Sequence, residues 1–490
     1  MTIPSFSLFL EAKPLYYKEI DHLRVHRAYA SLAEKIHHPE TIHIIGTNGK
    51  GSTGRMIAHL AYQGSGSGFS VGHFSSPHLL SFNERIWLDG KDVDDEVLER
   101  AHRKLYSILG REMSEALSYF EYTTLLALVV FEHCDLIVLE AGLGGEYDAT
   151  SVCNRVLSVV TPIDMDHQAF LGESIEAIAS TKIRSIQKRA LLAPQPWPEV
   201  LEIAKKIAGE KRAELYLSTR KSDSPEPERS LPPNTKEPET SVLSDVSEAE
   251  TSLPSDTLES ETSVPPNILE SETSLLPDTP EPETSVPLDV LEPERSLPPK
   301  VCNRNDPINP EALRTRSISP EKQRFLEEIA IEKGWPAFLQ ENALVAMQAL
   351  DLLKLVYRLD DLRSLELFGR FYPLSDNIRI DVGHNPLAAK AIVEALEGPV
   401  VLLYNSLEDK EYERVLQILK PKIKRVEILP ITSQRAATVE SIRTALEQLD
   451  VPFGDFNGEC DPGEDYLIFG SFYTVEAFIK RRKKRIDGTE

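Results

Sequence analysis

The stretch Thr41–Leu60, TIHIIGTNGKGSTGRMIAHL, decides the fold of this chain. It begins with a short apolar run, which predicts a buried strand, and it passes through closely spaced glycines into a helix expected from about Ser52. In such a unit, glycines let backbone N–H groups approach an anion, and the positive end of the helix dipole faces it. Lys50 adds a full positive charge, so the stretch predicts a phosphate-binding loop. The common GxxxxGK[ST] spacing does not apply, because Ile44 stands at the first glycine position and Gly51 follows the lysine directly.

Short apolar runs alternate with helix-period stretches on both sides of this loop. The alternation predicts an α/β fold, with a mostly parallel sheet covered by helices on both faces. A second series of apolar runs predicts a smaller, Rossmann-like C-terminal α/β domain. We therefore expect a nucleotide-binding domain over 1–360, interrupted by an insert over 219–318, and a C-terminal domain over 361–490.

The insert contains a repetitive, acidic segment. Between residues 221 and 300 an eleven-residue unit recurs, marked by glutamates at 228, 239, 250, 261, 272, 283 and 294. This segment holds 15 of the 34 prolines, and 19 acidic against 5 basic residues. Prolines break helices and the segment has few core-forming side chains, so we expect a disordered tract. Two interpretations stay open: a tolerated expansion of a surface loop, and an arm that binds a partner.

Composition excludes several classes of protein. The 490 residues carry a net charge of −24, which argues against a nucleic-acid partner because phosphate binding needs a basic face. The four cysteines are dispersed, which favours a reducing, cytoplasmic location over a disulfide scaffold. The N-terminus lacks the pattern of a signal peptide, and the longest apolar run, Thr123–Phe131, is too short to span a membrane. We expect no membrane partner.

The loop GTNGKGS (Gly46–Ser52) resembles the ATP loop of the Mur ligase superfamily, most closely that of the folylpolyglutamate synthase/dihydrofolate synthase branch. Further segments resemble that branch in the same order along the chain. They are FSSPHLLSFNERI (Phe74–Ile86), SYFEYTTLLAL (Ser118–Leu128), LEAGLGGEYDAT (Leu139–Thr150), DMDHQAFLG (Asp164–Gly172), FGRF (Phe368–Phe371), DVGHNPLAA (Asp381–Ala389), EDKEY (Glu408–Tyr412), SQRA (Ser433–Ala436) and GSFYTV (Gly470–Val475). The residues in these segments are most similar to those of the bacterial bifunctional enzymes.

The resemblance implies an ADP-forming ligase. In this family a carboxylate of dihydropteroate or a folate attacks the γ-phosphate of ATP, and L-glutamate then displaces phosphate from the acyl phosphate. Mg²⁺ would be the metal, since phosphoryl transfer needs charge neutralisation by a hard cation. A monofunctional folylpolyglutamate synthase, a muramyl amino-acid ligase and a non-catalytic scaffold that uses the repeats remain alternatives. We also expect a monomer.

The resemblance also assigns roles to individual residues. The ATP-binding set is Thr47, Asn48, Gly49, Lys50, Gly51, Ser52, Asn342, Arg370 and Asp381. The metal ligands would be Ser76, Glu140 and His167. The catalytic set is Lys50, Lys182 and His384. The pterin of the substrate would contact Ser118, Tyr119, Phe120, Glu121, Tyr147, Asp148 and Ala149.

Two positions depart from the family pattern. Lys182 occupies the place of a lysine that is carbamylated in the family, but the usual Glu-Lys-Ala-Gly-Ile has become Thr181-Lys182-Ile183-Arg184-Ser185. Carbamylation and an ordinary surface lysine are both open at this position. Glu146 replaces the arginine of the family's Gly-Gly-Arg-x-Asp, a charge reversal that we expect to affect substrate affinity.

Overall fold

The structure is a computed structural model that describes residues 3–13, 21, 23–66, 68–219 and 313–486. The eleven-residue repeats, and the disorder expected of them, lie outside these residues. The expected insert nevertheless overlaps the described part, since strand β9 (Arg314–Arg316) falls within 219–318. Among the described helices, none combines the length and the apolar character needed to cross a membrane.

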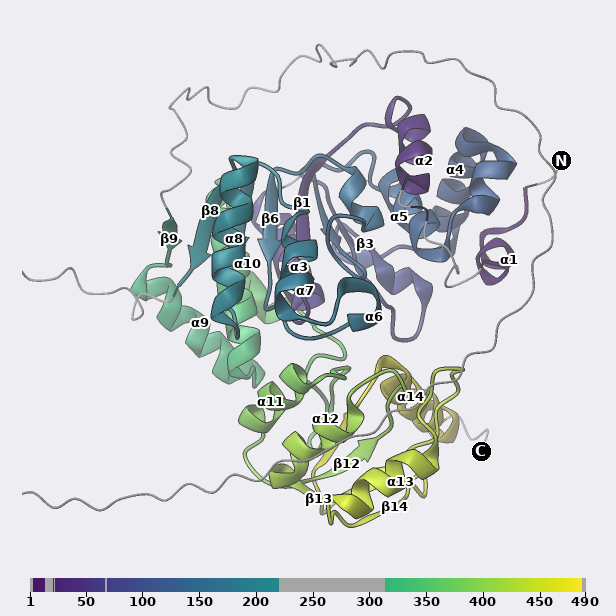
Figure 1. Cartoon of the computed structure of the whole chain (residues 1–490), viewed down its shortest axis with the longest axis vertical. Coiled ribbons are helices and arrows are strands. Elements are labelled where there is room, and N and C mark those ends of the chain that lie inside the picture. Colours follow the sequence, from purple (N-terminus) through teal and green to yellow (C-terminus); the bar gives the residue numbers. More distant parts are fainter. Residues whose placement is uncertain (1–2, 14–20, 22, 67, 220–312, 487–490) are drawn as a thin grey trace, which may run out of the picture. The chain divides into compact units, whose positions relative to one another are not determined.

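The first sheet of the described part has nine strands, in the order β4-β3-β2-β5-β1-β6-β7-β8-β9 (Figure 1). All neighbouring strands are parallel except β3 against β2 and β4 against β3. The strands are β1 (Glu40–Ile45), β2 (Val71–Phe74), β3 (Ile86–Leu88), β4 (Lys91–Asp92), β5 (Leu136–Glu140), β6 (Leu157–Val160), β7 (Arg189–Leu192), β8 (Glu214–Ser218) and β9.

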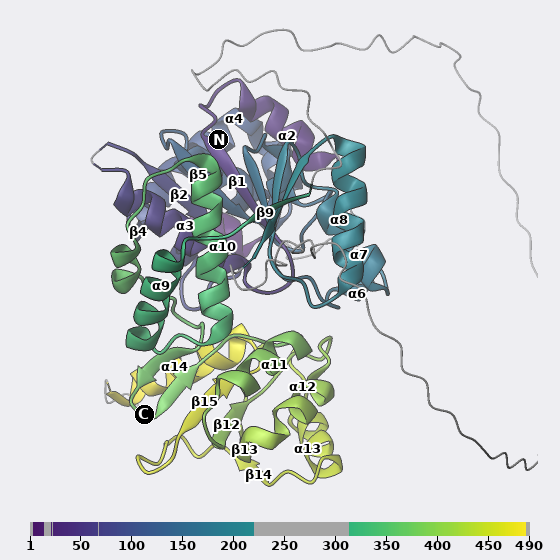
Figure 2. The same ribbon diagram turned by 90° about the vertical axis from the view of Figure 1, so that its left-hand side faces the viewer.

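Helices cover both faces of this sheet, because successive strand side chains point to opposite sides. Ile42 and Ile44 of β1 pack in one core with helices α3 (Lys50–Gly64), α9 (Pro320–Lys333) and α10 (Ala337–Leu353), and α3 lies beside α10 (Figure 2). Side chains of the alternate register face two further cores. Their helices are α1 (Phe6–Glu11), α2 (Arg24–Ala33), α4 (Asp95–Ala116), α5 (Tyr119–Val130), α7 (Ile175–Ile183) and α8 (Pro198–Lys211).

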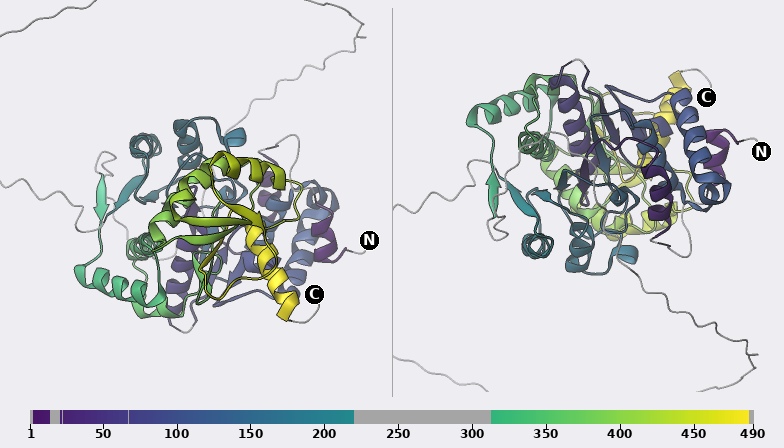
Figure 3. Two further views of the ribbon diagram at one scale, coloured as in Figure 1. Left: turned by 90° about the horizontal axis from the view of Figure 1, so that it is seen from below. Right: turned by 90° about the horizontal axis from the view of Figure 1, so that it is seen from above.

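The second sheet has six described strands in the order β10-β11-β15-β12-β13-β14, parallel except for β10. Helix α14 (Phe472–Ile486) covers one face, and α11 (Pro386–Ala395), α12 (Tyr412–Leu419) and α13 (Val439–Gln448) cover the other (Figure 3). The strands are β10 (Tyr372–Ser375), β11 (Ile378–Ile380), β12 (Val400–Tyr404), β13 (Ile423–Ile428), β14 (Phe453–Asp455) and β15 (Tyr466–Phe469).

The expected fold class, a mostly parallel α/β sheet followed by a smaller Rossmann-like sheet, is confirmed. The expected boundary at residue 360 falls inside the 3-10 helix η4 (Leu359–Ser364), whose Leu362 packs in the core of the first sheet. The boundary therefore stays a prediction.

Candidate active site

The site is built from loops that follow four adjacent strands, β2, β5, β1 and β6. Because these strands are parallel, the loops after their carboxyl ends meet at one edge of the sheet, where open α/β sheets bind ligands. Ser76 follows β2, Glu140 ends β5, the glycine-rich loop follows β1, and His167 follows β6. Residues separated by more than a hundred positions are brought to one edge in this way.

The glycine-rich loop is shaped by two positions with positive φ. Gly46 has φ 140°, and a Cβ there would lie 2.1 Å from Thr161 Oγ1. Gly49 has φ 84°, and a Cβ there would lie 2.8 Å from the side-chain oxygen of Asn342. The N–H groups of Thr47 and Asn48 both donate to the carbonyl of Pro162, which holds the loop against the segment after β6. Helix α3 then begins at Lys50, so its first turn faces the loop.

Two polar side chains in the first turn of α3, those of Lys50 and Ser52, form hydrogen bonds to the glycine-rich loop. Lys50 Nζ donates to the carbonyls of Gly46 (3.3 Å) and Thr47 (3.1 Å), which holds the ammonium over the loop. Ser52 Oγ donates to the Gly49 carbonyl and accepts from Asn342 Nδ2 of α10 at 2.8 Å. The expected nucleotide residues of the loop and Asn342 are therefore in contact.

Glu140 is a buried carboxylate beside this loop, with 4% of its surface exposed. Its Oε2 accepts the N–H of Ser76 at 3.2 Å, and a Cβ on Gly51 would lie 3.4 Å from the same oxygen. Burial raises the pKa of Glu140, while the charges of Lys50 and Arg370 oppose that rise. Arg370 Nη2 would lie 3.3 Å from the Gly51 Cβ, so both charged groups flank the first turn of α3.

The expected metal ligands are only partly brought together. Among the described residues, no three His, Cys, Asp or Glu side chains form a cluster that could hold a metal ion. Ser76 and Glu140 are in contact, but His167 makes no described contact with either. A buried carboxylate oxygen beside a phosphate loop is the kind of donor that Mg²⁺ prefers, so Glu140 fits the expected ion.

Lys182 of α7 lies beneath the loop rather than on the surface, and only 1% of it is exposed. Its Nζ donates to the carbonyls of Gly46 (3.2 Å) and Leu143 (2.7 Å). Burial, together with the nearby charge of Lys50, lowers the pKa of Lys182 to about 7. The amine thus joins the loops after β1 and β5, and a large share of it is neutral near pH 7.

A buried ion pair that the sequence did not reveal lies at the same edge. Asp166 Oδ1 is 2.7 Å from Lys410 Nζ, which follows β12 of the second sheet. Burial opposes ionisation of Asp166, yet the charge and the hydrogen bond of Lys410 hold its pKa well below the usual range. Burial lowers the pKa of His167 to about 3, so its ring is neutral at pH 7. No sequence signal connects positions 166 and 410, which are 244 residues apart.

One side chain after the second sheet's strand β11, Asn385, also contacts the loop, and two further expected site residues, Asp381 and His384, lie close to it in the sequence. Asn385 and Asn48 form a reciprocal amide pair, with N···O distances of 3.0 and 2.8 Å. Asp381 accepts the N–H groups of Phe371 (2.8 Å) and Gly383 (2.7 Å), and its burial raises its pKa. His384 is half-buried, and burial lowers its pKa. Asn385 was not among the expected site residues.

The expected pterin residues divide into two kinds. Ser118 and Glu121 form the capping box of α5, and Glu121 also pairs with Arg24 at 2.8 Å. Asp148 caps the 3-10 helix η2 (Ala149–Val152) through Thr150, and Ala149 is buried. These side chains hold the backbone in place.

The aromatic members of that set are differently placed. The Arg85 guanidinium lies 5.2 Å from the centroid of the Tyr119 ring. Phe120 packs so closely on Gly142 that a Cβ there would lie 2.7 Å from its ring. Tyr147 is 57% exposed. Of the seven expected pterin residues, all of them described, only Tyr147 is exposed.

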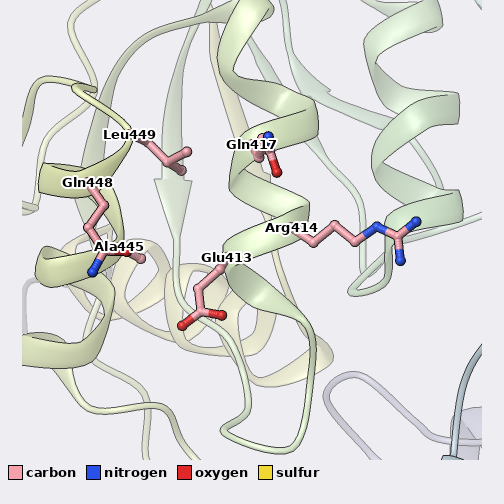
Figure 4. Close-up of a pocket in the computed structure, with 6 residues that line it drawn as sticks. All are labelled: Glu413, Arg414, Gln417, Ala445, Gln448 and Leu449. Carbon is pink, nitrogen blue, oxygen red and sulfur yellow. The ribbon is translucent and has the colours of Figure 1, made fainter. Parts of the chain in front are cut away.

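A separate hollow lies between α12 and α13 of the second sheet (Figure 4). It is lined by Glu413, Arg414, Gln417, Ala445, Gln448 and Leu449. None of the expected site residues lines it, and we assign it no part in the site.

Comparison with known proteins gives the family. No family model matches the sequence. A dihydrofolate synthase/folylpolyglutamate synthase of Haemophilus influenzae is 42% identical over 158 residues, which are 31% of this chain and 35% of that protein. A protein of the same name from Buchnera aphidicola is 25% identical over 90% of this chain and 88% of its own length. The first curated alignment thus spans about a third of its relative.

Solved structures extend the likeness to almost the whole chain. Escherichia coli FolC, in complex with DHPP and ADP, has a TM-score of 0.65 at 24% identity, covers 98% of this chain and supports the fold. The folylpolyglutamate synthetase of Helicobacter pylori has a TM-score of 0.62 and is 32% identical, and the match covers 98% of both chains. At that identity and coverage, this chain belongs to the folylpolyglutamate synthase/dihydrofolate synthase family.

Proposed function

We propose that the protein uses ATP to join L-glutamate to dihydropteroate and to folates, releasing ADP and phosphate. The observation that carries this proposal is the convergence of Lys50, Glu140 and Arg370 on the first turn of α3. The proposal is supported by relatives that are named dihydrofolate synthase/folylpolyglutamate synthase. A structure of a bifunctional relative holds Mn, AMPPNP and L-glutamate.

The reaction would proceed in two steps. A substrate carboxylate oxygen attacks the γ-phosphorus of ATP, the bond to the bridging oxygen breaks, and ADP leaves. The glutamate amine then attacks the acyl carbon, phosphate leaves, and the nitrogen loses a proton. Lys50 and Arg370 would stabilise the charge on the transferred phosphoryl group. Asp381 would bind the ribose with the lone pairs that its two backbone donors leave free, and His384 would lie beside the reacting groups.

We propose Mg²⁺ as the divalent ion, with Glu140 and Ser76 as ligands of one ion and His167 at a second. When bound, the ion neutralises phosphate charge and orients the γ-phosphate. Chelation by EDTA is expected to weaken ATP binding by native protein more than tenfold, and to change little in a Glu140→Gln variant. Equal weakening in both proteins, measured by calorimetry, would remove Glu140 from the metal site.

We propose that Lys182 is carbamylated despite its altered neighbours. The neutral amine nitrogen attacks carbon dioxide, a C–N bond forms, and one proton leaves, which converts the neutral amine into an anionic carbamate. Burial and a pKa of about 7 supply the neutral amine that this step needs. Protein equilibrated with ¹³C-bicarbonate should show a carbamate carbonyl resonance that Lys182→Met lacks. Identical spectra for the two proteins would contradict the proposal.

The first experiment is ADP release with Mg·ATP and L-glutamate, run separately with dihydropteroate and with tetrahydrofolate. Turnover with both supports the bifunctional enzyme, and turnover with tetrahydrofolate alone supports the monofunctional alternative. Lys50→Ala should abolish both. ATP binding without any turnover would indicate that the protein acts on a different substrate. Glu146 and the neighbours of Lys182 would then be the first residues to replace by those of the family pattern.

Two alternatives are tested alongside. Turnover of a nucleotide-linked muramyl substrate would favour a muramyl amino-acid ligase, and unchanged ATP turnover after deletion of 221–300 would exclude a scaffold that acts through the repeats. We further propose a cytoplasmic monomer, as the dispersed cysteines favour a reducing compartment; light scattering measures the oligomeric state.

A further inference from the structure

Helix α14 ends in an unbroken run of basic residues, Lys480–Arg485, in a chain whose net charge is −24. Lys480, Lys483 and Lys484 are exposed. They are spaced by three and four positions, so they project from neighbouring places on one face of the helix. Lys480 already pairs with Glu476 on the surface, an interaction weak enough to exchange for another carboxylate.

This helix begins at the candidate active site. The ring of Phe472, its first residue, lies 5.2 Å from the guanidinium of Arg370, and Arg370 flanks Gly51. With a rise of about 1.5 Å per residue, Lys480 lies about 12 Å and Lys484 about 18 Å along the axis from Phe472. The basic face therefore begins about 12 Å along the helix from Phe472, the residue that contacts Arg370 at the candidate active site.

The loop after β2 packs against the middle of the same helix. Its Leu79 shares a hydrophobic core with Val475 and Phe478 of α14. In the same segment Arg85 Nε donates to His78 Nδ1 at 2.8 Å, and Arg85 stacks on Tyr119. Burial lowers the pKa of His78 to about 4, and the charge of Lys480 adds to that effect. The charges of Arg85, beside Tyr119, and of Lys480, in the basic end of α14, thus both act on His78.

We propose that the face formed by Lys480, Lys483 and Lys484 binds the α-carboxylates of the γ-linked glutamate tail on a folate substrate. The inference rests on the proposed function and extends it to the substrate's tail. Each added γ-linked glutamate leaves one more free carboxylate, so the tail becomes a polyanion. An acidic protein repels such a tail except where bases gather, and this basic face adjoins the site where the tail grows.

The test compares two charge-matched triple variants of the full chain. K480Q/K483Q/K484Q removes the basic face of α14, and K205Q/K206Q/K211Q removes three exposed lysines from α8 of the first sheet. For each protein, KM is measured with a tetrahydrofolate carrying one glutamate and with one carrying five. The ratio of the pentaglutamate KM to the monoglutamate KM should rise about fivefold in the α14 variant only, as expected for a few exposed charge contacts. The rise should fade in high salt, because salt screens exposed charges.

A second measurement separates this inference from the proposed function. Fluorescent penta-γ-glutamate without a pterin should bind native protein and the α8 variant, and bind the α14 variant at least fivefold more weakly. If no folate is turned over, the proposed function fails while this binding assay still decides the inference. Equal KM ratios in both variants, or equal binding of the labelled tail, would overturn the inference. Loss of oligonucleotide binding in the α14 variant with no change in either readout would assign the face to nucleic acid instead.

Discussion

At the scale of single residues, the site depends on backbone positions that only glycine can occupy. Gly46 has φ 140° and no room for a Cβ between itself and Thr161. Its carbonyl also accepts the Nζ groups of Lys50 and Lys182. One glycine therefore sets the path of the loop and the position of two lysines.

Gly46→Ala should lower the free energy of unfolding by about 2 kcal/mol or more and abolish ATP binding, since the added methyl group clashes with Thr161 and strains the backbone. Urea unfolding and calorimetry with ATP measure the two effects. Gly209→Ala on α8 is the matched control, because nothing lies within 4 Å of that Cβ. There alanine should stabilise the helix slightly. Similar losses in both variants would contradict the role of Gly46.

The buried Lys182 predicts a pH dependence of stability. The pKa of Lys182 is about 7 in the folded protein and 10.5 in the unfolded chain, so between these values the unfolded chain binds more protons than the folded one. The cost of burying the charge is fully present below pH 7 and declines as pH rises toward 10.5. The stability of Lys182→Met relative to native protein should therefore fall with rising pH in this window, by at most about 1.4 kcal/mol per pH unit. Urea unfolding of both proteins at pH 6, 7.5 and 9, in buffer freed of carbon dioxide and bicarbonate so that Lys182 carries a free amine, measures it, and a constant difference would contradict the prediction.

At the scale of elements, the loops of the two sheets are joined by a few polar contacts. The Asp166–Lys410 pair links the loop after β6 to the loop after β12, and the Asn48–Asn385 pair links the glycine-rich loop to the start of α11. Both links involve residues next to expected site residues, the expected metal ligand His167 and the expected catalytic residue His384. The packing of these elements thus determines where those histidines lie.

Lys410→Met should destabilise the protein by about 3 kcal/mol, because it leaves the Asp166 carboxylate buried without its partner. Adding Asp166→Asn should recover part of that loss, since the amide carries no charge. Lys205→Met, which breaks the exposed pair with Glu202, should change stability by less than about 1 kcal/mol. Strictly additive losses in the Lys410 and Asp166 variants would show that the pair is not coupled.

At the scale of the whole molecule, the described residues on either side of the repeats lie in neighbouring strands of the first sheet. β8 and β9 are paired in parallel, and Thr219 N–H donates to the Arg316 carbonyl at 2.9 Å. The described end of β8 and the described start of β9 are therefore separated by only about the length of a short strand. A long segment is tolerated at such a place because the entropy of closing a loop grows slowly with its length.

Deletion of residues 221–300 should leave the free energy of unfolding within about 1 kcal/mol of the native value and ATP turnover unchanged, for the same reason. Residues 301–312 would still bridge β8 and β9. Thermal unfolding and ADP release measure the two quantities. Loss of turnover with unchanged stability would instead assign the repeats a role in the reaction.

The sequence by itself determined the local units of this protein. The apolar run of β1, the glycines that follow and the helix that starts at Lys50, two residues before the expected Ser52, all depend on short-range periodicity and backbone freedom. For the same reason the α/β alternation predicted both sheets, and ordered motifs indicated the family.

Tertiary structure decided which of these units meet. Lys182, which the sequence left open as a surface lysine, is buried, and its burial lowers the pKa of its amine. Ser118 and Glu121, expected to contact the pterin, form the capping box of α5. The partners Lys410 and Asn385 emerged only from the packing of the second sheet's loops against the first. Periodicity reports the environment of a few neighbouring residues, whereas an ion pair between positions 166 and 410 depends on how every intervening element packs.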